Sequence, residues 1–357
     1  MKVCIIGDGL TSLALAQALV NKGIYTDVFL SENIKKKDKS RTLGISKSNI
    51  EFFNKKITNI EKLLWNIKKI EIYSENLNDE KILDFEKKDE RLFSVIKNHE
   101  LISHLTKQLK KNKFLKFKKN FSDYDSIKND YQLIFNCEFN NNITKKFFFK
   151  KFNKNYNSFA YTTVIEHKKL LKNNVATQTF TKEGPIAFLP ISNNKTSIVY
   201  SLKGKRKTRI ESLIDRFNIK YEINKIHKIN YFELKSSNLR SYYYKNILAF
   251  GDLLHKIHPL AGQGFNMSVR DIKVLIEIIE SRINLGLDLD NSICLEFENQ
   301  NKHKNYIFSS SIDFIHEFFN LENKIDSNIL SKAIKLFGNS KIPNNLFIKF
   351  ADEGILI

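Results

Sequence analysis

Residues 249–271, AFGDLLHKIHPLAGQGFNMSVRD, bring a carboxylate, two histidines and three glycines together, although the chain holds only 12 glycines. NILAFGD predicts a strand that ends at Asp252, and FNMSVRDIKVLIEIIESRI predicts a long helix. Between them, Pro259 stiffens a loop that Gly262 and Gly264 leave without side chains. Such a loop before a helix N-terminus is an anion site, because free N–H groups and the helix dipole face the ligand. A flat ring that becomes negatively charged would fit there, and Asp252 suits the hydroxyls of a polyol.

The two histidines of this stretch, His255 and His258, suggest metal binding or acid–base catalysis as alternatives. Two histidines three residues apart, without a third ligand, make a poor metal site. The interpretation favoured here is that both are loop residues that hydrogen-bond backbone near a ligand. The sequence shows no catalytic triad and no metal site, so the catalytic residues stay unassigned.

A second glycine turn, GDGLTS, lies near the N-terminus. It separates a strand predicted at 2–7 from a helix predicted at 13–23, and a further strand is predicted at 25–30. Strand, glycine turn, helix and strand are the opening of a dinucleotide-binding unit. We therefore expect a nucleotide at this end of the chain.

The residues of the turn fit that expectation in part. Gly7 permits the tight turn, Gly9 lets the backbone approach a pyrophosphate, and Ser12 is small enough for close packing of helix on strand. The acid that should bind ribose hydroxyls at the end of the second strand is absent, because Leu30 stands there. Glu32, two residues on, is the candidate to replace it.

The elements that position these residues follow from hydrophobic patterns further along the chain. An amphipathic helix is predicted at 101–112, and the chain from 264 to its end is mostly helical in pattern. Strands are predicted at 67–74, 81–87, 131–139, 158–167, 174–181, 184–192, 196–202 and 231–236. In the last helices, Phe314, Phe318 and Phe319 follow the spacing of a buried face, which favours a place in the core.

Composition limits the class of protein. The 357 residues carry a formal net charge of +20 and three scattered cysteines, with no signal peptide and no apolar run of the ~20 residues that a spanning helix needs. The lysine excess is spread along the chain, so solvated loops are favoured over nucleic-acid binding, and a weak attraction to anionic lipid stays open. A cytoplasmic protein is expected, with the inner face of the cytoplasmic membrane as a candidate working place.

The 249–271 stretch resembles the second FAD-binding motif of aromatic-ring flavin monooxygenases, in the form seen in ubiquinone-biosynthesis hydroxylases. GDGLTS, FTKEGPIAFLPIS (180–192) and LFGNSKIPNNLFIKFADEG (336–354) are similar to the same family, and Arg41 and Asn98 stand where it places flavin-side residues. The resemblance implies an α/β fold: a Rossmann-type FAD-binding domain of residues 1–66, 92–146 and 240–357 with C-terminal helices, and an inserted β-rich substrate domain of 67–91 and 147–239.

The resemblance also implies a function. FAD would be the cofactor, with Asp252 on its ribitol or ribose hydroxyls, and Gly262, Gln263, Gly264 and Asn266 at the pyrimidine end of its ring. NAD(P)H or another donor would supply electrons, and an oxygen atom would pass to the ring of a polyprenylated phenol. Because that substrate is lipid-soluble, peripheral membrane contact and a biosynthetic complex are expected.

One segment departs from the family pattern. Many members have an Asp-Gly pair where this chain reads NCEFNNN, with Glu138 for the acid and Phe139 for the glycine. Two alternatives therefore stay open: a flavin oxidoreductase or hydroxylase with a soluble aromatic substrate, and a degenerate non-catalytic relative that serves as a scaffold.

Overall fold

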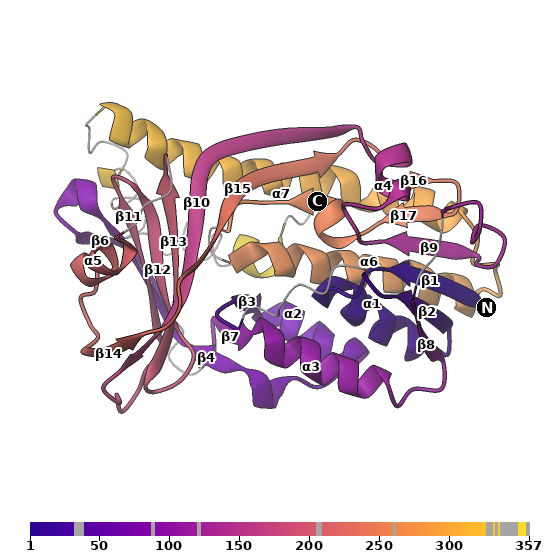
Figure 1. Ribbon diagram of the computed structural model, residues 1–357, viewed down its shortest axis with the longest axis horizontal. Helices are drawn as coiled ribbons and strands as arrows, with labels where there is room; N and C mark the ends of the chain where they lie inside the picture. The colour runs from indigo at the N-terminus through magenta and orange to yellow at the C-terminus, as the bar shows by residue number, and fades with distance from the viewer. Residues whose placement is uncertain are drawn as a thin grey trace.

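The computed structural model describes residues 1–31, 39–86, 90–119, 123–204, 209–259, 262–325, 331–332, 335 and 349–354. Two large sheets occupy opposite ends of the molecule, and helices run between them and along the top and bottom of the view (Figure 1). Glu32 and residues 336–348 of the motif at 336–354 lie outside the described residues.

A six-stranded sheet, at the right in Figure 1, carries the N-terminal turn. Its strands are β1 (Lys2–Ile6), β2 (Tyr25–Phe29), β8 (Leu115–Lys118), β9 (Leu133–Asn136), β16 (Tyr243–Tyr244) and β17 (Ile247–Ala249). The spatial order is β16-β17-β9-β1-β2-β8, and every pair except β16–β17 is parallel. Parallel order brings the carboxyl ends of β1, β2, β9 and β17 to one edge, where open α/β sheets bind ligands.

Helices cover this sheet. Helix α1 (Leu10–Val20) contacts α3 (Asn98–Leu109) and α6 (Gln263–Asn284), and α6 also contacts α7 (Ser292–Ile325). The main hydrophobic core joins the central strands to these helices, with Val3, Ile5, Leu15 and Leu275 fully buried. No described helix is both long enough and apolar enough to span a membrane.

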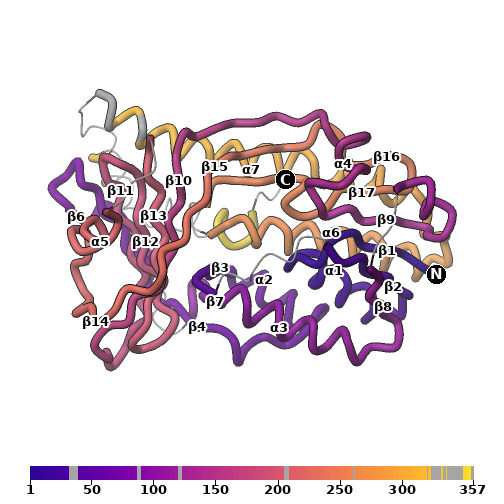
Figure 2. The backbone as a smooth tube through the Cα atoms, in the orientation of Figure 1, coloured from indigo at the N-terminus to yellow at the C-terminus, as the bar shows by residue number. Residues whose placement is uncertain are grey.

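A nine-stranded sheet lies at the other end of the molecule. It contains β5 (Lys69–Ser74), β6 (Glu80–Glu86), β10 (Lys151–His167), β11 (Val175–Thr181), β12 (Gly184–Pro190), β13 (Lys195–Lys203), β14 (Ile223–Ile226), β15 (Asn230–Leu239) and β18 (His255–Lys256). Strands β10 and β15 pair with each other and run from this sheet toward the six-stranded sheet (Figure 2).

Shorter elements lie between the two sheets. One is a three-stranded sheet that contains β3 (Thr42–Ser46), β7 (Phe93–Lys97) and β4 (Trp65–Ile67). Helix α2 (Lys47–Phe52) and the π-helix Phe53–Ile57 follow β3 along the chain. The remaining helices are α4 (Asn142–Phe147), α5 (Ile210–Arg216) and the 3-10 turns Glu61–Leu63, Glu75–Leu77 and Gly251–Leu253.

The strands predicted at 2–7, 25–30 and 174–181 and the helix predicted at 101–112 are confirmed, with small shifts at their ends. The strand predicted at 158–167 is also present, but it is longer than predicted, because β10 begins at Lys151. The core prediction for three phenylalanines holds for Phe319 and is wrong for Phe314, whose side chain is 67% exposed. Helical spacing identifies a face but not which neighbour covers it. The division into two domains with the stated bounds stays a prediction.

Candidate functional site

A cavity of about 1940 Å³ lies between the two large sheets. It is larger than the ~300–1,000 Å³ typical of a site for one small molecule, so it can hold two ligands side by side. The glycine turn at the carboxyl edge of the six-stranded sheet forms one part of its wall, and the nine-stranded sheet with α7 forms the other.

The structure brings most of the predicted residues together at this cavity. Its lining includes Gly9, Ser12, Arg41, Asn98, Asp252, Pro259, Gly262, Gln263, Gly264 and Asn266. Gly7 is not among the lining residues, and Glu32 is outside the described residues. Residues that are far apart in sequence therefore meet at one place, as expected for ligand-binding loops at a sheet edge.

The first glycine turn leaves an open cradle before α1. Gly7 has a φ of 106° and its N–H donates to the carbonyl of Phe29, which closes the turn. A Cβ at Gly9 would meet nothing within 4 Å, and α1 begins without a side-chain cap or an acidic residue in its first turn. The N–H groups and positive dipole end of α1 therefore face open space, as a pyrophosphate site requires.

The second glycine turn is fitted against β3. Gly262, the N-cap of α6, has a φ of 65°, and a Cβ there would lie 3.1 Å from the Gly44 nitrogen. Only glycine fits this position without strain. Asp252 is exposed on the wall nearby and forms no hydrogen bond with any described residue, so its carboxylate is free to accept from a ligand.

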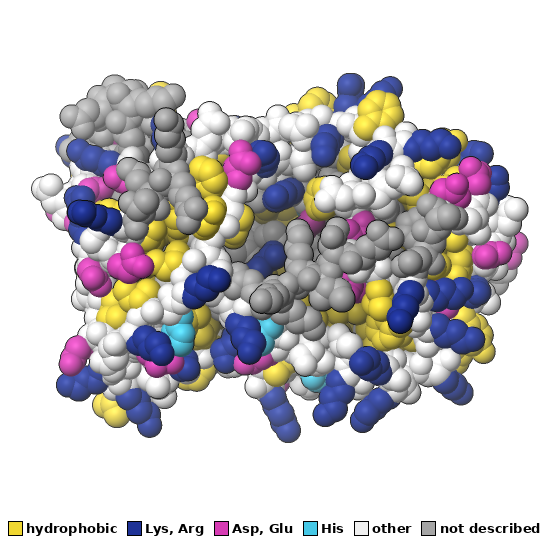
Figure 3. Space-filling model, viewed as in Figure 1, with side chains coloured by type: hydrophobic (Ala, Val, Ile, Leu, Met, Phe, Trp, Pro, Cys, Tyr) yellow, Lys and Arg dark blue, Asp and Glu magenta, His cyan; other side chains and the backbone are white. Residues whose placement is uncertain are grey.

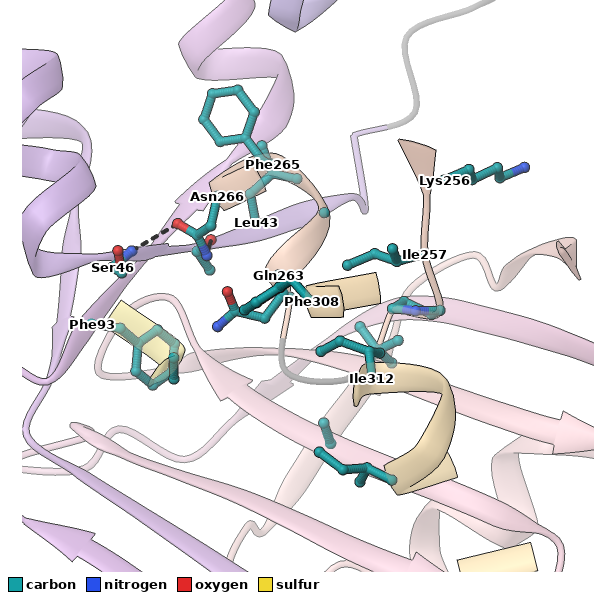
Figure 4. A pocket seen from close by; sticks show the side chains of 18 of the residues that line it. Leu43, Ser46, Phe93, Lys256, Ile257, Gln263, Phe265, Asn266, Phe308 and Ile312 are labelled. Atoms are coloured by element: carbon teal, nitrogen blue, oxygen red, sulfur yellow. Dashed lines mark hydrogen bonds between the residues drawn. The ribbon is translucent and has the colours of Figure 1, made fainter. Parts of the chain in front are cut away.

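Asn266 connects α6 to the small sheet. Its side-chain oxygen accepts from the Ser46 backbone N–H and from the Asn49 amide, both at 3.0 Å, and its own amide donates to the Gly44 carbonyl at 3.2 Å. Figure 4 shows the side chain turned toward Ser46. Asn266 therefore lines the cavity and stabilises its wall, because its side-chain amide is hydrogen-bonded to protein groups and not left for a ligand.

Gln263 differs from Asn266 in having an acceptor to spare. Its Oε1 is buried and has no partner among the described residues. In Figure 4 its side chain lies between Asn266 and Phe308 on the cavity wall. A buried acceptor without a donor costs about 1–3 kcal/mol, which a donor on a bound ligand would relieve. This orphaned oxygen and the open cradle at Gly9 both fit FAD, whose ring offers an N–H donor and whose pyrophosphate needs the cradle.

The favoured interpretation of the two histidines is wrong in its detail. Nε2 of His255 lies 2.5 Å from Oδ2 of buried Asp271, so this histidine bonds a carboxylate on α6 and not the backbone. His258 is 1% exposed, and neither of its ring nitrogens has a partner among the described residues. Its ring contacts Tyr156 and His316, and burial lowers its pKa to about 3. The partner of His255, Asp271, lies 16 residues further along the chain, so no local sequence pattern indicates this pair.

The apolar half of the cavity was not assigned residue by residue from the sequence. A row of paired residues crosses one face of the nine-stranded sheet, and all of its members line the cavity: Leu83, Ile72, Gln178, Ala187, Val199 and Thr162. Phe308, Ile312 and Phe319 of α7 complete this wall. Alternation along each strand was the available signal, but the pairing register that aligns the row comes only from the structure.

The last described segment also closes on the site. Residues 349–352 and 354 line the cavity, and Asp352 accepts from the Ser48 backbone N–H at 2.9 Å and, through its carbonyl, from the Ser46 hydroxyl at 3.0 Å. The stretch 336–354, which resembles the family, therefore reaches the site at its carboxyl end.

Comparison with solved structures defines the class of fold. The p-nitrophenol 4-monooxygenase PnpA of Pseudomonas putida matches 99% of this chain and 98% of its own with a TM-score of 0.78 at 12% identity. Klebsiella pneumoniae HpxO, solved with FAD and uric acid, matches 98% and 96% with a TM-score of 0.74 at 13% identity. The predicted α/β fold with a Rossmann-type sheet, a second β-sheet and C-terminal helices is therefore confirmed as that of FAD-dependent monooxygenases.

Comparison with curated proteins narrows the resemblance. The mitochondrial ubiquinone biosynthesis monooxygenase COQ6 of Schizosaccharomyces pombe is 22% identical over 230 residues, 51% of this chain and 48% of that protein. The 3-demethoxyubiquinol 3-hydroxylase of Escherichia coli is 28% identical over 153 residues, 40% and 39%. No family model matches. The predicted resemblance to ubiquinone-biosynthesis hydroxylases is confirmed, and the chain aligns with about half or less of the length of these relatives.

Proposed function

We propose that this protein is an FAD-dependent monooxygenase that hydroxylates the aromatic ring of a polyprenylated phenol in ubiquinone biosynthesis. The observation that carries the proposal is one continuous cavity with two kinds of wall. Glycine turns and a helix N-terminus suited to an anionic cofactor form one wall, and an apolar sheet face suited to a hydrocarbon chain forms the other. The resemblance to COQ6 and to the 3-hydroxylase supports this substrate class.

The residues on the first wall have separable roles. The N-terminus of α1 and Gly9 would hold the pyrophosphate, and Asp252 would accept from ribitol hydroxyls. The backbone of Gly262–Gly264 and Oε1 of Gln263 would meet the pyrimidine end of the ring. Arg41, which immediately precedes β3, and Asn98, the first residue of α3, complete the flavin side of the wall. When bound and reduced, the flavin supplies oxygen activation with O₂, which no side chain of the protein can provide.

The second wall would hold and orient the phenol. Its aliphatic and aromatic side chains exclude water and match an isoprenoid tail, whose burial is favourable by about 25 cal/mol per Å². Gln178 and Thr162 are the polar members of the sheet row, and the Gln178 amide bonds no described residue. It is therefore placed to bind the phenolic oxygen and turn the ring toward the flavin side.

The proposal also includes an electron donor and a location in the cell. NAD(P)H would serve as the electron donor, in keeping with the resemblance. Peripheral contact with a membrane would bring the substrate to the cavity, whose lining includes the exposed residues Phe232, Tyr306, Ile307 and Phe314 together with Lys235 and Lys256. Exposed apolar residues beside lysines are the combination that docks on anionic lipid. Membership of a biosynthetic complex is proposed on the resemblance alone.

Isotope-labelled turnover tests the function. Purified protein supplied with FAD, NADH or NADPH, ¹⁸O₂ and a phenol bearing a short prenyl chain is expected to form a product one labelled oxygen heavier, detected by mass spectrometry. A matched phenol without the prenyl chain is expected to react poorly, because the apolar wall then stays unfilled.

The other outcomes separate the alternatives. Labelled product from the tail-less phenol alone would identify a hydroxylase of soluble aromatics. Absence of labelled product with every phenol and donor, from protein that retains FAD, would contradict the monooxygenase proposal and favour a scaffold. Deleting the gene supplies the cellular counterpart: a ubiquinone precursor that lacks one hydroxyl should accumulate.

A further inference from the structure

The segment NCEFNNN places a carboxylate at the nucleotide edge of the six-stranded sheet. Glu138 follows β9, which lies beside β1. Its side chain crosses the end of β1, because a Cβ built on Gly7 would lie 3.0 Å from both its Cγ and its Oε1. Oε1 then accepts from the Ser31 hydroxyl at 2.5 Å, just past the end of β2. A carboxylate that follows β9 thus reaches the end of β2, where the sequence pattern led us to expect an acid.

The backbone that carries Glu138 is fixed by a polar network. Asn136 Oδ1 accepts from the Glu138 N–H at 3.2 Å and from the Asn141 amide at 2.7 Å. The Thr144 hydroxyl donates to the Glu138 carbonyl at 2.5 Å, and Asn141 caps α4 by accepting from the Thr144 N–H. These bonds fix the main chain on both sides of Glu138, so its side chain is directed toward β2. The segment that replaces Asp-Gly is therefore an ordered structure with its own hydrogen bonds.

The position of Glu138 leaves the pyrophosphate cradle open. The carboxylate lies against Gly7, whereas the space at Gly9, where α1 begins, contains no atom within 4 Å of a built Cβ. Glu138 also lines the large cavity together with Gly9 and Ser12. A carboxylate repels phosphate but accepts hydrogen bonds from hydroxyls, and its two oxygens offer about four acceptor sites. Among the described residues only the Ser31 hydroxyl uses one of them.

We propose that Glu138, at the end of β9, binds the ribose hydroxyls of the adenosine half of FAD, in place of an acid at the end of β2. This inference rests on the proposed FAD-binding function and adds a residue to it. The Ser31 hydroxyl already shows that Glu138 accepts from a hydroxyl at this position. The ribose would share or replace that bond.

The test compares two flavins that differ in the adenosine half. FAD contains the ribose that Glu138 would bind, whereas FMN lacks it and keeps the ribityl chain. Dissociation constants for both are measured by quenching of flavin fluorescence in wild-type protein and in Glu138→Ala, Glu138→Gln and Glu51→Gln. Glu51, an exposed glutamate on α2 that does not line the cavity, is the matched control. Circular dichroism checks that each variant is folded.

The expected result is a loss specific to FAD. Both Glu138 variants should bind FAD about 10- to 100-fold more weakly, since a hydrogen bond to a charged group is removed, and should bind FMN as wild type does. Glu51→Gln should match wild type with both flavins. The milder Glu138→Gln variant keeps the size of the side chain, so a loss in it cannot come from an empty space.

Three outcomes would overturn the inference. The first is unchanged FAD affinity in both folded variants. The second is tighter FAD binding, which would show that Glu138 obstructs the site. The third is an equal loss of affinity for FAD and FMN, which would show that Glu138 supports the fold of the whole site. If FMN binds wild type too weakly to measure, the FAD values alone decide. Failure of the wild type to bind FAD would instead remove the proposed function itself, so the two failures are distinguishable.

Discussion

Asp252 stands exposed on the cavity wall with its carboxylate bonded to no described residue. Its replacement should therefore cost little folding free energy and affect ligand binding directly. We expect Asp252→Ala to weaken FAD binding by about ten-fold or more, which corresponds to the roughly 1.5–3 kcal/mol of a hydrogen bond to a charged group. Because ribityl hydroxyls are present in FMN too, FMN binding should weaken as well.

Flavin titration of this variant by fluorescence quenching supplies the check. Asp288→Ala, an exposed acid far along the chain and outside the cavity lining, is the control and should bind flavin normally. Wild-type affinity in Asp252→Ala would remove Asp252 from the flavin site.

The buried ring of His258 makes stability depend on pH. Burial, and then the positive charges of His316 and Lys154, lower its pKa to about 3, whereas an unfolded histidine has a pKa of about 6.5. The pKa of neighbouring His316 is also lowered by burial, and Asp313 bonds Tyr156 beside both rings. The folded state keeps His258 neutral while the unfolded state takes up a proton. Stability is therefore complete above pH 6.5 and is lost as the pH falls from there toward 3.

Urea unfolding at pH 7 and pH 5 measures the loss. His258 alone should contribute a decrease of about 2 kcal/mol in the free energy of unfolding over this interval. His258→Phe, which keeps a ring against Tyr156, should show a decrease smaller by that amount. His303→Phe, a change at an exposed histidine of α7, should retain the wild-type pH dependence. An identical decrease in wild type and His258→Phe would contradict the assignment.

At the scale of elements, the contact between α6 and β3 sets the shape of the flavin side of the cavity. Asn266 is 2% exposed, and its side chain makes hydrogen bonds to Ser46, Asn49 and Gly44. Asn266→Ala would leave the Ser46 N–H and the Gly44 carbonyl buried without this partner. We expect the free energy of unfolding to fall by about 2–3 kcal/mol, measured by urea denaturation.

Asn284→Ala, at the exposed carboxyl end of the same helix, is the matched control and should change stability by less than about 0.5 kcal/mol. If Asn266→Ala were as stable as this control, the hydrogen bonds between α6 and β3 would not be stabilising the cavity wall.

Elements that depend on local patterns were predictable, and their contacts were not. The strand–turn–helix unit at 2–23 and the helix after Gly262 follow from alternation, helical spacing and glycine. Asn266 was expected beside the flavin ring, but its amide is turned into β3, a strand 220 residues away. Likewise, the reach of Glu138 to Ser31 spans 107 residues and depends on β9 lying beside β1. Side-chain direction across such distances follows from sheet order, which the sequence does not state.

Across the whole molecule, the lysines that give the net charge of +20 are distributed along the chain and are not concentrated in one patch. Figure 3 shows Lys and Arg side chains over most of the face in view, with acidic side chains between them. Such a surface attracts anionic lipid weakly, and exposed apolar side chains such as Phe314 would add to it. We expect the protein to float with liposomes that contain anionic lipid at low salt and to dissociate at high salt.

Neutral liposomes are the lipid control, and Phe314→Ser should reduce flotation by removing an exposed aromatic group without opening the core. Absence of flotation at every salt concentration would contradict direct membrane contact and leave a partner protein or a soluble substrate as the route to the cavity.

Whether the cavity between the two sheets binds FAD can be read from the visible absorption spectrum of the protein. Purified protein is incubated with excess FAD, passed through a desalting column, and its flavin and protein concentrations are compared. We expect a yellow protein with one FAD per chain, which releases intact FAD on denaturation because no covalent bond is involved. Protein that is folded by circular dichroism but emerges colourless after incubation with excess FAD would show that the cavity does not bind FAD.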